Sequence, residues 1–190
     1  MEENPITVQV ALCIRPLIQT EITRGCQLCL ETVPKEPQVQ VHGTDNVFTY
    51  NFVFGPEESQ VNFYNTAVKN LHFQLFKGYN VTILAYGQTG SGKTFSMGTT
   101  YTADDNMGII PRAINDIFET MKELQNWDFK ITVCFMELYQ EQLFDLVFLI
   151  SLLNLWISIF RKLLNLAISK IFCNSIMYLS FDRDGIQSMK

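Results

Sequence analysis

The sequence Gly87-Gln88-Thr89-Gly90-Ser91-Gly92-Lys93-Thr94 decides the fold of this chain. It matches the pattern Gly, four residues, Gly, Lys, and Ser or Thr, which forms a phosphate-binding loop between a strand and a helix. The run before it, Val81-Thr82-Ile83-Leu84-Ala85-Tyr86, is apolar and rich in β-branched residues, so we predict a buried strand there. A strand that feeds a glycine-rich loop is the context that the motif requires.

The residue types of this loop suit a polyphosphate. Gly87, Gly90 and Gly92 can adopt backbone conformations closed to other residues, so successive N–H groups can point at phosphate oxygens. The ammonium of Lys93 would lie against the β- and γ-phosphates, and the hydroxyl of Thr94 would coordinate the magnesium ion that bridges them. We therefore predict a site for a nucleoside triphosphate with magnesium. The alternative is a glycine-rich turn beside a surface lysine.

Length and composition describe a folded chain with an acidic balance. The chain has 190 residues, of which 47% are hydrophobic, and a formal net charge of −5. This apolar content excludes a disordered chain, and no basic patch in residues 1–147 indicates contact with nucleic acid through charge. Residues 1–5 are unlike a secretory signal, so we expect the protein in the cytosol or nucleus.

The cysteines carry little information about function. There are 5 of them, without the spacing of a disulfide framework, and we expect free thiols in a reducing compartment. Cys26 and Cys29 form a Cys-x-x-Cys pair, but a zinc site needs two more ligands, and His42 and His72 are the only histidines. We predict two ordinary thiols rather than a metal site.

Apolar periodicity alternates between strand and helix. Segments with an alternating pattern, predicted as strands, are residues 7–14, residues 48–54 with one aromatic face, and residues 129–146. Segments with helical spacing are residues 61–75, ending near Gly78, and a helix opening at Pro111 with a buried stripe of Ile114, Ile117, Phe118, Met121 and Leu124. The polar residues 99–108 are expected to form an exposed loop. Interleaved strands and helices predict an α/β fold with helices packed on a central sheet.

Four stretches, in order along the chain, carry a family resemblance. They are residues 48–54, residues 86–94 preceded by residues 78–80, the sequence Gly108-Ile109-Ile110-Pro111-Arg112, and the segment from Glu137-Leu138-Tyr139 to Asp145-Leu146. Together they resemble the motor domains of kinesins. The sequences Cys26-Gln27-Leu28-Cys29 and Phe76-Lys77-Gly78-Tyr79-Asn80 are most similar to the kinesin-4, or chromosome-associated, branch.

The resemblance implies a P-loop NTPase of the kinesin-motor type, with a central mixed sheet flanked by helices, here incomplete. It implies ATP and magnesium as ligands, with Thr94 as the magnesium ligand. The residues that it assigns to the nucleotide in this loop are Gly87, Gln88, Thr89, Gly90, Ser91, Gly92, Lys93 and Thr94.

The resemblance also assigns residues to the base. Arg15 and Pro16 match the end of an Arg-x-Arg-Pro motif that borders the adenine, and Phe95 takes the place of a ring that packs on it. Cys13 replaces the first arginine of that motif, which removes a cation near the nucleotide. The alternative for Arg15 and Phe95 is an ordinary surface charge and an ordinary core ring.

The resemblance covers residues 1–147, and we expect residues 148–190 to be an apolar tail unrelated to the motor, for example from a retained intron or alternative exon. No stretch matches either switch motif of kinesins, Asn-x-x-Ser-Ser-Arg-Ser-His or Asp-Leu-Ala-Gly-Ser-Glu, so no catalytic residue is predicted. Hydrolysis requires groups that orient water and stabilise the transferred phosphoryl. We therefore expect nucleotide binding with little hydrolysis by this chain alone.

Three functions remain open from the sequence. The first is part of a kinesin-like microtubule motor, on the cytoskeleton in the cytoplasm, whose full-length parent would also reach chromatin in the nucleus or spindle. The second is a non-catalytic nucleotide-binding isoform, and the third is a membrane-associated interaction protein dominated by the tail. The longest uncharged run of the tail, residues 146–160, has 15 residues, fewer than the roughly 20 that span a bilayer, so no membrane span is predicted.

Overall fold

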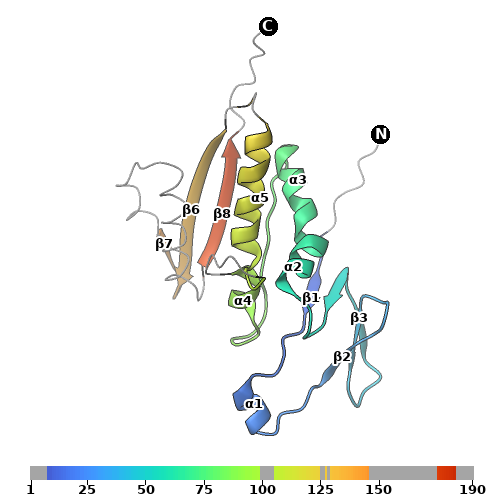
Figure 1. Cartoon of the computed structure of the whole chain (residues 1–190). Helices are drawn as coiled ribbons and strands as arrows, with labels where there is room; N and C mark the ends of the chain where they lie inside the picture. The colour runs from blue at the N-terminus through green and yellow to red at the C-terminus, as the bar shows by residue number, and fades with distance from the viewer. Residues whose placement is uncertain (1–7, 99–104, 125–126, 128, 146–174, 183–190) are drawn as a thin grey trace. The chain divides into compact units, whose positions relative to one another are not determined.

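The computed structural model describes residues 8–98, 105–124, 127, 129–145 and 175–182 (Figure 1). The chain divides into two compact units, Met1–Phe63 and Tyr64–Lys190. None of the helices in these ranges is long and apolar enough to cross a membrane. The uncharged run at residues 146–160, and most of the loop predicted at residues 99–108, lie outside the described residues.

A parallel pair of short strands forms one part of the first unit. β1 (Ala11–Cys13) pairs with β5 (Phe52–Phe54), which confirms the end of the strand predicted at residues 7–14. The buried ring of Phe54 meets the ring of Phe63 edge to face, with 5.0 Å between the centroids. Phe63 ends helix α2 (Gln60–Phe63), so this aromatic pair ties the strand to the helix.

An antiparallel meander forms the other sheet of the first unit. Its strands, in spatial order, are β2 (Leu30–Thr32), β3 (Gln38–Val41) and β4 (Val47–Thr49). Val39 on the middle strand is nearly fully buried, so it is the centre of this small apolar core. A short helix, α1 (Gln19–Thr23), precedes the meander in the chain.

The single aromatic strand predicted over residues 48–54 is wrong, because the chain forms two strands there. β4 pairs antiparallel with β3, whereas β5 pairs parallel with β1. Between them, the amide of Tyr50 donates to the carbonyl of Pro37 at 2.9 Å. The amide of Asn51 donates to the carbonyl of Val10 at 3.1 Å. The chain changes from one sheet to the other at this point, which the aromatic alternation could not reveal because the partner strands lie elsewhere in the sequence.

The second unit opens with a helical segment that contains a π turn. η1 (Tyr64–Val68) follows α2 directly and continues into α3 (Lys69–Phe76). The helix predicted over residues 61–75 is thus confirmed in position, and Gly78, with φ of 90°, follows its end as predicted. The π turn was not predicted, because apolar spacings of three and four residues fit α and π turns alike.

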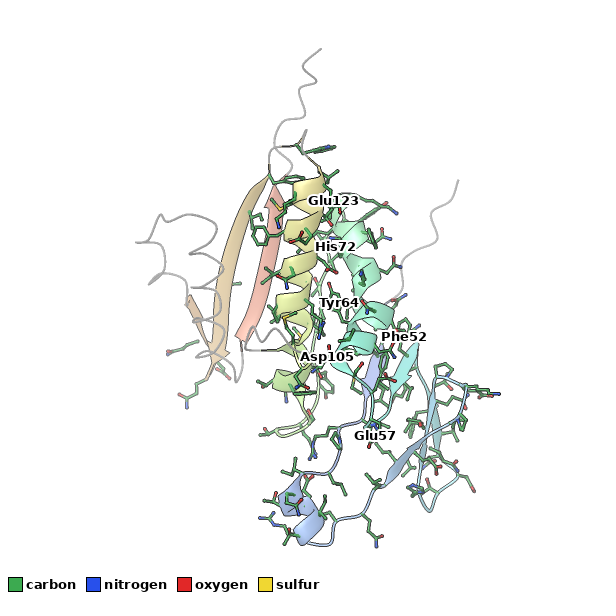
Figure 2. All side chains as sticks on the ribbon, in the orientation of Figure 1. Phe52, Glu57, Tyr64, His72, Asp105 and Glu123 are labelled. Carbon is green, nitrogen blue, oxygen red and sulfur yellow. The ribbon has the colours of Figure 1, made fainter. Side chains whose placement is uncertain are left out.

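Helix α5 (Ile109–Glu123) packs against η1 and α3 in the second unit. Two polar contacts join these helices. The hydroxyl of Tyr64 donates to Oδ2 of Asp116 at 3.0 Å, and Nε2 of His72 lies 2.9 Å from Oγ1 of Thr120. Figure 2 shows Tyr64 and His72 between the helices, where they fix the position of α5 along α3.

The helix predicted to open at Pro111 begins two residues earlier, at Ile109. Proline is tolerated there because the first turn of a helix needs no intrahelical acceptor for its N–H groups. The buried stripe is confirmed at Ile114 and Ile117. The other three predicted members are only partly buried; they are Phe118, Met121 and Leu124.

The strand predicted over residues 129–146 is a hairpin. β6 (Lys130–Tyr139) turns through Gln140 and Glu141, with φ of 48° and 63°, into β7 (Gln142–Asp145). The other edge of β6 pairs antiparallel with β8 (Ser175–Asp182), which comes from the segment expected to be a separate tail. Residues 146–174 and 183–190 of that segment lie outside the described residues.

The strand predicted at residues 81–86 is not formed. Leu84 is 79% exposed and Tyr86 is fully exposed, so the segment is not buried as predicted. A strand exists only by hydrogen bonding to another strand, and no described strand pairs with this segment. The strands of the described residues are divided among three sheets with both parallel and antiparallel pairing, and with the helices they confirm the α/β class.

Candidate functional site

Three glycines shape the loop that leads into helix α4 (Lys93–Met97). Gly87, Gly90 and Gly92 have φ of 151°, 80° and 96°, values that residues with a side chain rarely adopt. Gly92 is the residue that caps the start of α4. The predicted backbone conformation of the loop is therefore confirmed at all three positions.

The side chain of Lys93 closes the loop on itself. Its Nζ donates hydrogen bonds to the carbonyl oxygens of Gly87 (2.6 Å) and Gln88 (2.8 Å). The lysine thus joins the first residues of the loop to the first residue of α4. An ammonium group has three N–H donors, and these two contacts leave one that can reach an anion held by the loop.

Ser91 packs against the start of the loop. Its amide donates to the carbonyl of Gln88 at 3.1 Å, while its buried Oγ has no hydrogen-bond partner among the described residues. A Cβ added at Gly87 would lie 2.5 Å from this Oγ. Gly87 is therefore required both for its positive φ and for the space that Ser91 occupies.

The remaining predicted loop residues are open to solvent. Gln88, Thr89 and Gly90 are exposed, as is Thr94 on the first turn of α4. Phe95 is 61% exposed, which excludes the alternative that it is an ordinary core ring.

The far end of α4 meets the start of α5, and the sequence analysis did not assign this contact. Gly98, which follows α4, and Gly108, which precedes α5, are both buried, and their backbones lie against each other. Arg112 of α5 holds the preceding loop, since its side chain donates to the carbonyls of Met107 (2.7 Å) and Asp105 (2.9 Å). The only signal in the sequence is a pair of glycines flanking a polar stretch.

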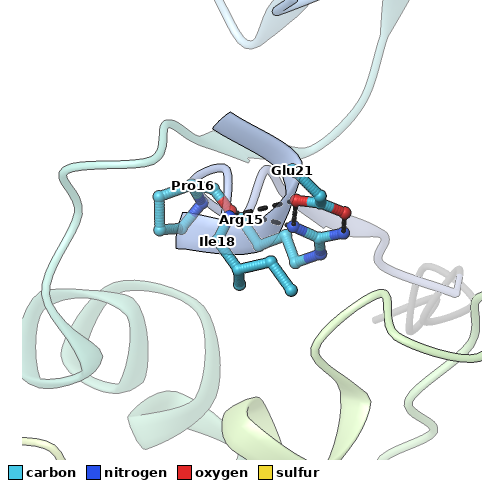
Figure 3. A network of polar contacts seen from close by, with 4 residues as sticks. All are labelled: Arg15, Pro16, Ile18 and Glu21. Atoms are coloured by element: carbon cyan, nitrogen blue, oxygen red, sulfur yellow. Dashed lines mark hydrogen bonds and ion pairs between the residues drawn. The ribbon is translucent and has the colours of Figure 1, made fainter. Parts of the chain in front are cut away.

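Arg15 and Pro16 belong to the first unit, within a compact polar network (Figure 3). The Arg15 guanidinium binds both carboxylate oxygens of Glu21, at 2.7 and 2.6 Å, and also donates to the carbonyl of Pro16 at 2.9 Å. Glu21 accepts the amide of Ile18 at 3.0 Å as well. Arg15 therefore braces the start of α1, and the place of Arg15 and Pro16 relative to the loop remains a prediction.

The hydrogen bonds of this network change the pKa of Glu21. The hydrogen bonds from Arg15, followed by that from Ile18, lower the pKa of Glu21 to about 2. Nearby, desolvation raises the pKa of the Cys13 thiol to about 11. Cys13 is therefore uncharged at neutral pH and does not substitute for a cation at that position.

Within the part of the chain that the structure describes, no group of three or more His, Cys, Asp and Glu side chains could hold a metal ion. Cys26 and Cys29 are free, exposed thiols. The loop offers magnesium a different kind of ligand, the exposed hydroxyl of Thr94.

The chemistry of the loop fits a magnesium-bound polyphosphate. Residues 87–94 include one ammonium and three hydroxyl residues beside the loop amides, and no carboxylate. A bound anion would therefore meet donors and a cation without an opposing charge from the loop itself.

Comparison with known families matches residues 13–151 to the kinesin motor domain. The chain is 51% identical over 150 residues to chromosome-associated kinesin KIF4 of Gallus gallus, and 50% identical over 150 residues to chromosome-associated kinesin KIF4A of Homo sapiens. Each match covers 77% of this chain and 12% of the relative. Kinesin-like protein KIF27 of Rattus norvegicus is 47% identical over 150 residues, which are 77% of this chain and 10% of the relative.

These matches confirm the family resemblance, its chromosome-associated branch and the fold class predicted from the sequence. The chain spans about a tenth of the length of the curated relatives it matches.

Proposed function

Because the chain belongs to the kinesin motor domain family, we propose that its loop at residues 87–94 binds magnesium-ATP as part of a microtubule motor. In the longer protein, ATP hydrolysis would drive movement along microtubules. The names of the KIF4 relatives support a chromosome-associated role for that protein. Its locations would be cytoplasmic microtubules, the nucleus or the spindle.

The position of the Lys93 ammonium carries the proposal. It is held at the carbonyls of Gly87 and Gln88, in a loop with glycines of positive φ at positions 87, 90 and 92. This cation is fixed before any ligand arrives, so binding an anion requires little ordering of the long lysine side chain. A preorganised cation beside backbone amides is what polyphosphate recognition requires.

The other residues take complementary roles in this proposal. The hydroxyl of Thr94 holds the magnesium ion, which when bound neutralises charge on the phosphate oxygens. The exposed ring of Phe95 packs on the base. Arg15 and Pro16 border the adenine, with Glu21 fixing the direction of the guanidinium.

A second candidate function is nucleotide binding without hydrolysis. It is favoured by the sequence, which contains neither of the two switch motifs that orient water and sense the γ-phosphate in kinesins. An ATPase assay of the 190-residue chain with and without microtubules separates the two functions. Turnover that microtubules stimulate and Lys93→Ala abolishes would contradict the second candidate.

Thermal unfolding of the purified chain with and without magnesium-ATP tests the binding itself. A ligand present at about 100 times its Kd stabilises the folded state by about 2.7 kcal/mol if it does not bind the unfolded state. We expect the transition to rise with magnesium-ATP in the wild type and to stay unchanged in Lys93→Ala.

Lys122→Ala is the matched control, because Lys122 is an exposed lysine of the same unit. Its ammonium forms an ion pair with Glu119, three residues earlier on the same helix. This variant should respond to magnesium-ATP as the wild type does. A wild-type transition that magnesium-ATP does not move would contradict the proposed function. Magnesium-tripolyphosphate, which lacks the base, measures how much of the shift comes from the phosphates.

A further inference from the structure

We propose that Gly98 and Gly108 are positioning residues for the phosphate-binding loop, because their backbone contact fixes helix α4 and, through it, Lys93. This inference rests on the proposed function. It concerns residues outside residues 87–94, and it assigns to the contact between α4 and α5 a part in holding nucleotide.

The contact between the two glycines leaves no room for a side chain. A Cβ added at Gly98 would lie 2.6 Å from Cα and 2.7 Å from N of Gly108. A Cβ added at Gly108 would meet the backbone of Gly98 and would lie 2.6 Å from the carbonyl carbon of Met97. All of these neighbours are main-chain atoms, which cannot move aside by changing rotamer as a flexible side chain can. Any larger residue must therefore separate the two helices.

A short series of contacts leads from the contact between Gly98 and Gly108, called the joint below, to the phosphate-binding loop. The amide of Gly98 donates to the carbonyl of Thr94 at 3.0 Å, which closes the last turn of α4. α4 has only 5 residues, so its first residue, Lys93, is next to Thr94 and lies about one and a half turns from Gly98. The Lys93 ammonium then reaches the carbonyls of Gly87 and Gln88. A shift of Gly98 therefore displaces the residue that closes the loop.

Arg112 braces the joint from the side of α5. Its amide lies 3.4 Å from the carbonyl of Gly108, and its side chain holds the carbonyls of Met107 and Asp105. Gly108 is thus held between α4 and a residue of a long, well-packed helix. Because α5 is anchored to η1 and α3, it provides the fixed reference against which α4 is placed.

The two glycines differ in a way that makes the inference testable. Gly98 has φ of 76°, so an alanine there is strained by its backbone as well as by the contact. Gly108 has φ of −81° and ψ of −169°, an extended conformation that any residue adopts. The effect of Gly108→Ala therefore comes from the contact alone.

Each variant has a matched control in the first unit. Gly43→Ala has nearly the same φ, 74°, but its Cβ would meet nothing within 4 Å. Gly55→Ala has no positive φ, and its Cβ would meet only Cγ2 of Thr32, at an ordinary 3.6 Å. The comparison of Gly98→Ala with Gly43→Ala, and of Gly108→Ala with Gly55→Ala, isolates the effect of the contact.

The experiment measures the Kd for magnesium-ATP of the full 190-residue chain by calorimetry, together with the midpoint of chemical unfolding. We expect Gly108→Ala and Gly98→Ala to raise the Kd by at least about tenfold in protein that remains folded. Gly43→Ala and Gly55→Ala should leave the Kd within about twofold of the wild type, whatever they do to the unfolding midpoint. A folded Gly108→Ala chain with the Kd of the wild type would overturn the inference.

If both glycine variants fail to fold, the Kd of Arg112→Lys for magnesium-ATP tests the inference instead. This variant keeps the positive charge but cannot hold two carbonyls with a planar fork, so we expect a Kd raised by about threefold or more. An unchanged Kd in that variant would also overturn the inference. A wild-type chain that does not bind magnesium-ATP would overturn the proposed function and this inference together, whereas unchanged binding in the variants overturns the inference alone.

Discussion

The hydroxyl of Tyr64 donates a hydrogen bond of 3.0 Å to Oδ2 of Asp116, a residue 52 positions later in the chain. Tyr64 is 3% exposed and lies in the π turn, so this bond joins η1 to α5 inside the second unit. Desolvation, then the charge of Asp116, raises the pKa of Tyr64 far above its ordinary value near 10, which keeps the phenol protonated as a donor.

Tyr64→Phe should therefore destabilise the second unit. It keeps the ring but leaves the Asp116 carboxylate without this donor, and losing such a partner costs about 1 to 3 kcal/mol. Chemical unfolding of the two proteins measures the difference. Tyr79→Phe, at an exposed tyrosine of the same unit, is the control and should have almost no effect. Equal stability of Tyr64→Phe and the wild type would show that the bond contributes nothing.

A second polar contact between the same helices predicts a further loss. His72 is buried, its Nε2 bonds to Oγ1 of Thr120, and its Nδ1 has no partner among the described residues. Thr120→Val removes the contact at nearly constant volume and should destabilise the protein by about 1 to 3 kcal/mol, since a buried ring nitrogen loses its partner. Thr120→Ser keeps the hydroxyl and should be much milder. If the two variants unfold at the same denaturant concentration, the hydrogen bond is not the cause.

The Arg15–Glu21 pair should make stability depend on pH in acid. The pKa of Glu21 in the folded protein is about 2, below its ordinary value near 4.5, so the carboxylate stabilises the fold above pH 4.5. That stabilisation is lost as the pH falls from about 4.5 through 2. The stability difference between the wild type and Glu21→Gln should therefore be constant near neutrality and shrink over that window. Unfolding midpoints measured across it, with the exposed Glu36→Gln as control, would reveal a constant difference if the pair were unimportant.

Gly87→Ala should weaken nucleotide binding for two separable reasons. Its φ of 151° is unfavourable for alanine, and the new Cβ would lie 2.5 Å from Oγ of Ser91. Gly90→Ala has a positive φ of 80° but would meet nothing within 4 Å. We expect the Kd for magnesium-ATP to rise by at least about tenfold in Gly87→Ala, and by less in Gly90→Ala. The double variant Gly87→Ala with Ser91→Gly should recover part of the loss, and no recovery would show that the contact with Ser91 is irrelevant.

Local features were predictable from the sequence because they depend on neighbouring residues. The glycines at positions 87, 90 and 92, the helix that ends shortly before Gly78 and the buried face at Ile114 and Ile117 all follow from residue type and spacing. The fold class followed from the phosphate-loop motif and the other family stretches, which residues 13–151 confirm.

Features that depend on distant partners were not predictable in this way. The apolar run at residues 81–86 has the composition of a strand, yet no described strand pairs with it. Residues 48–54 divide between two sheets because the first part pairs with β3 and the last part pairs with β1. The contact between Gly98 and Gly108 involves backbone atoms alone, so no pattern of side chains in the sequence predicts it.

The contact between Gly98 and Gly108 also brings the end of α4 and the start of α5 to one point in the second unit. A segment whose ends are held together can change length cheaply, since each doubling of a loop costs only about 0.6 kcal/mol of closure entropy. The ends of α4 and α5 are held together by contacts of their own residues, at Gly98 and Gly108. A peptide tag or small reporter domain could therefore be inserted between these two helices without moving either, one residue beyond the short helix that begins at Lys93.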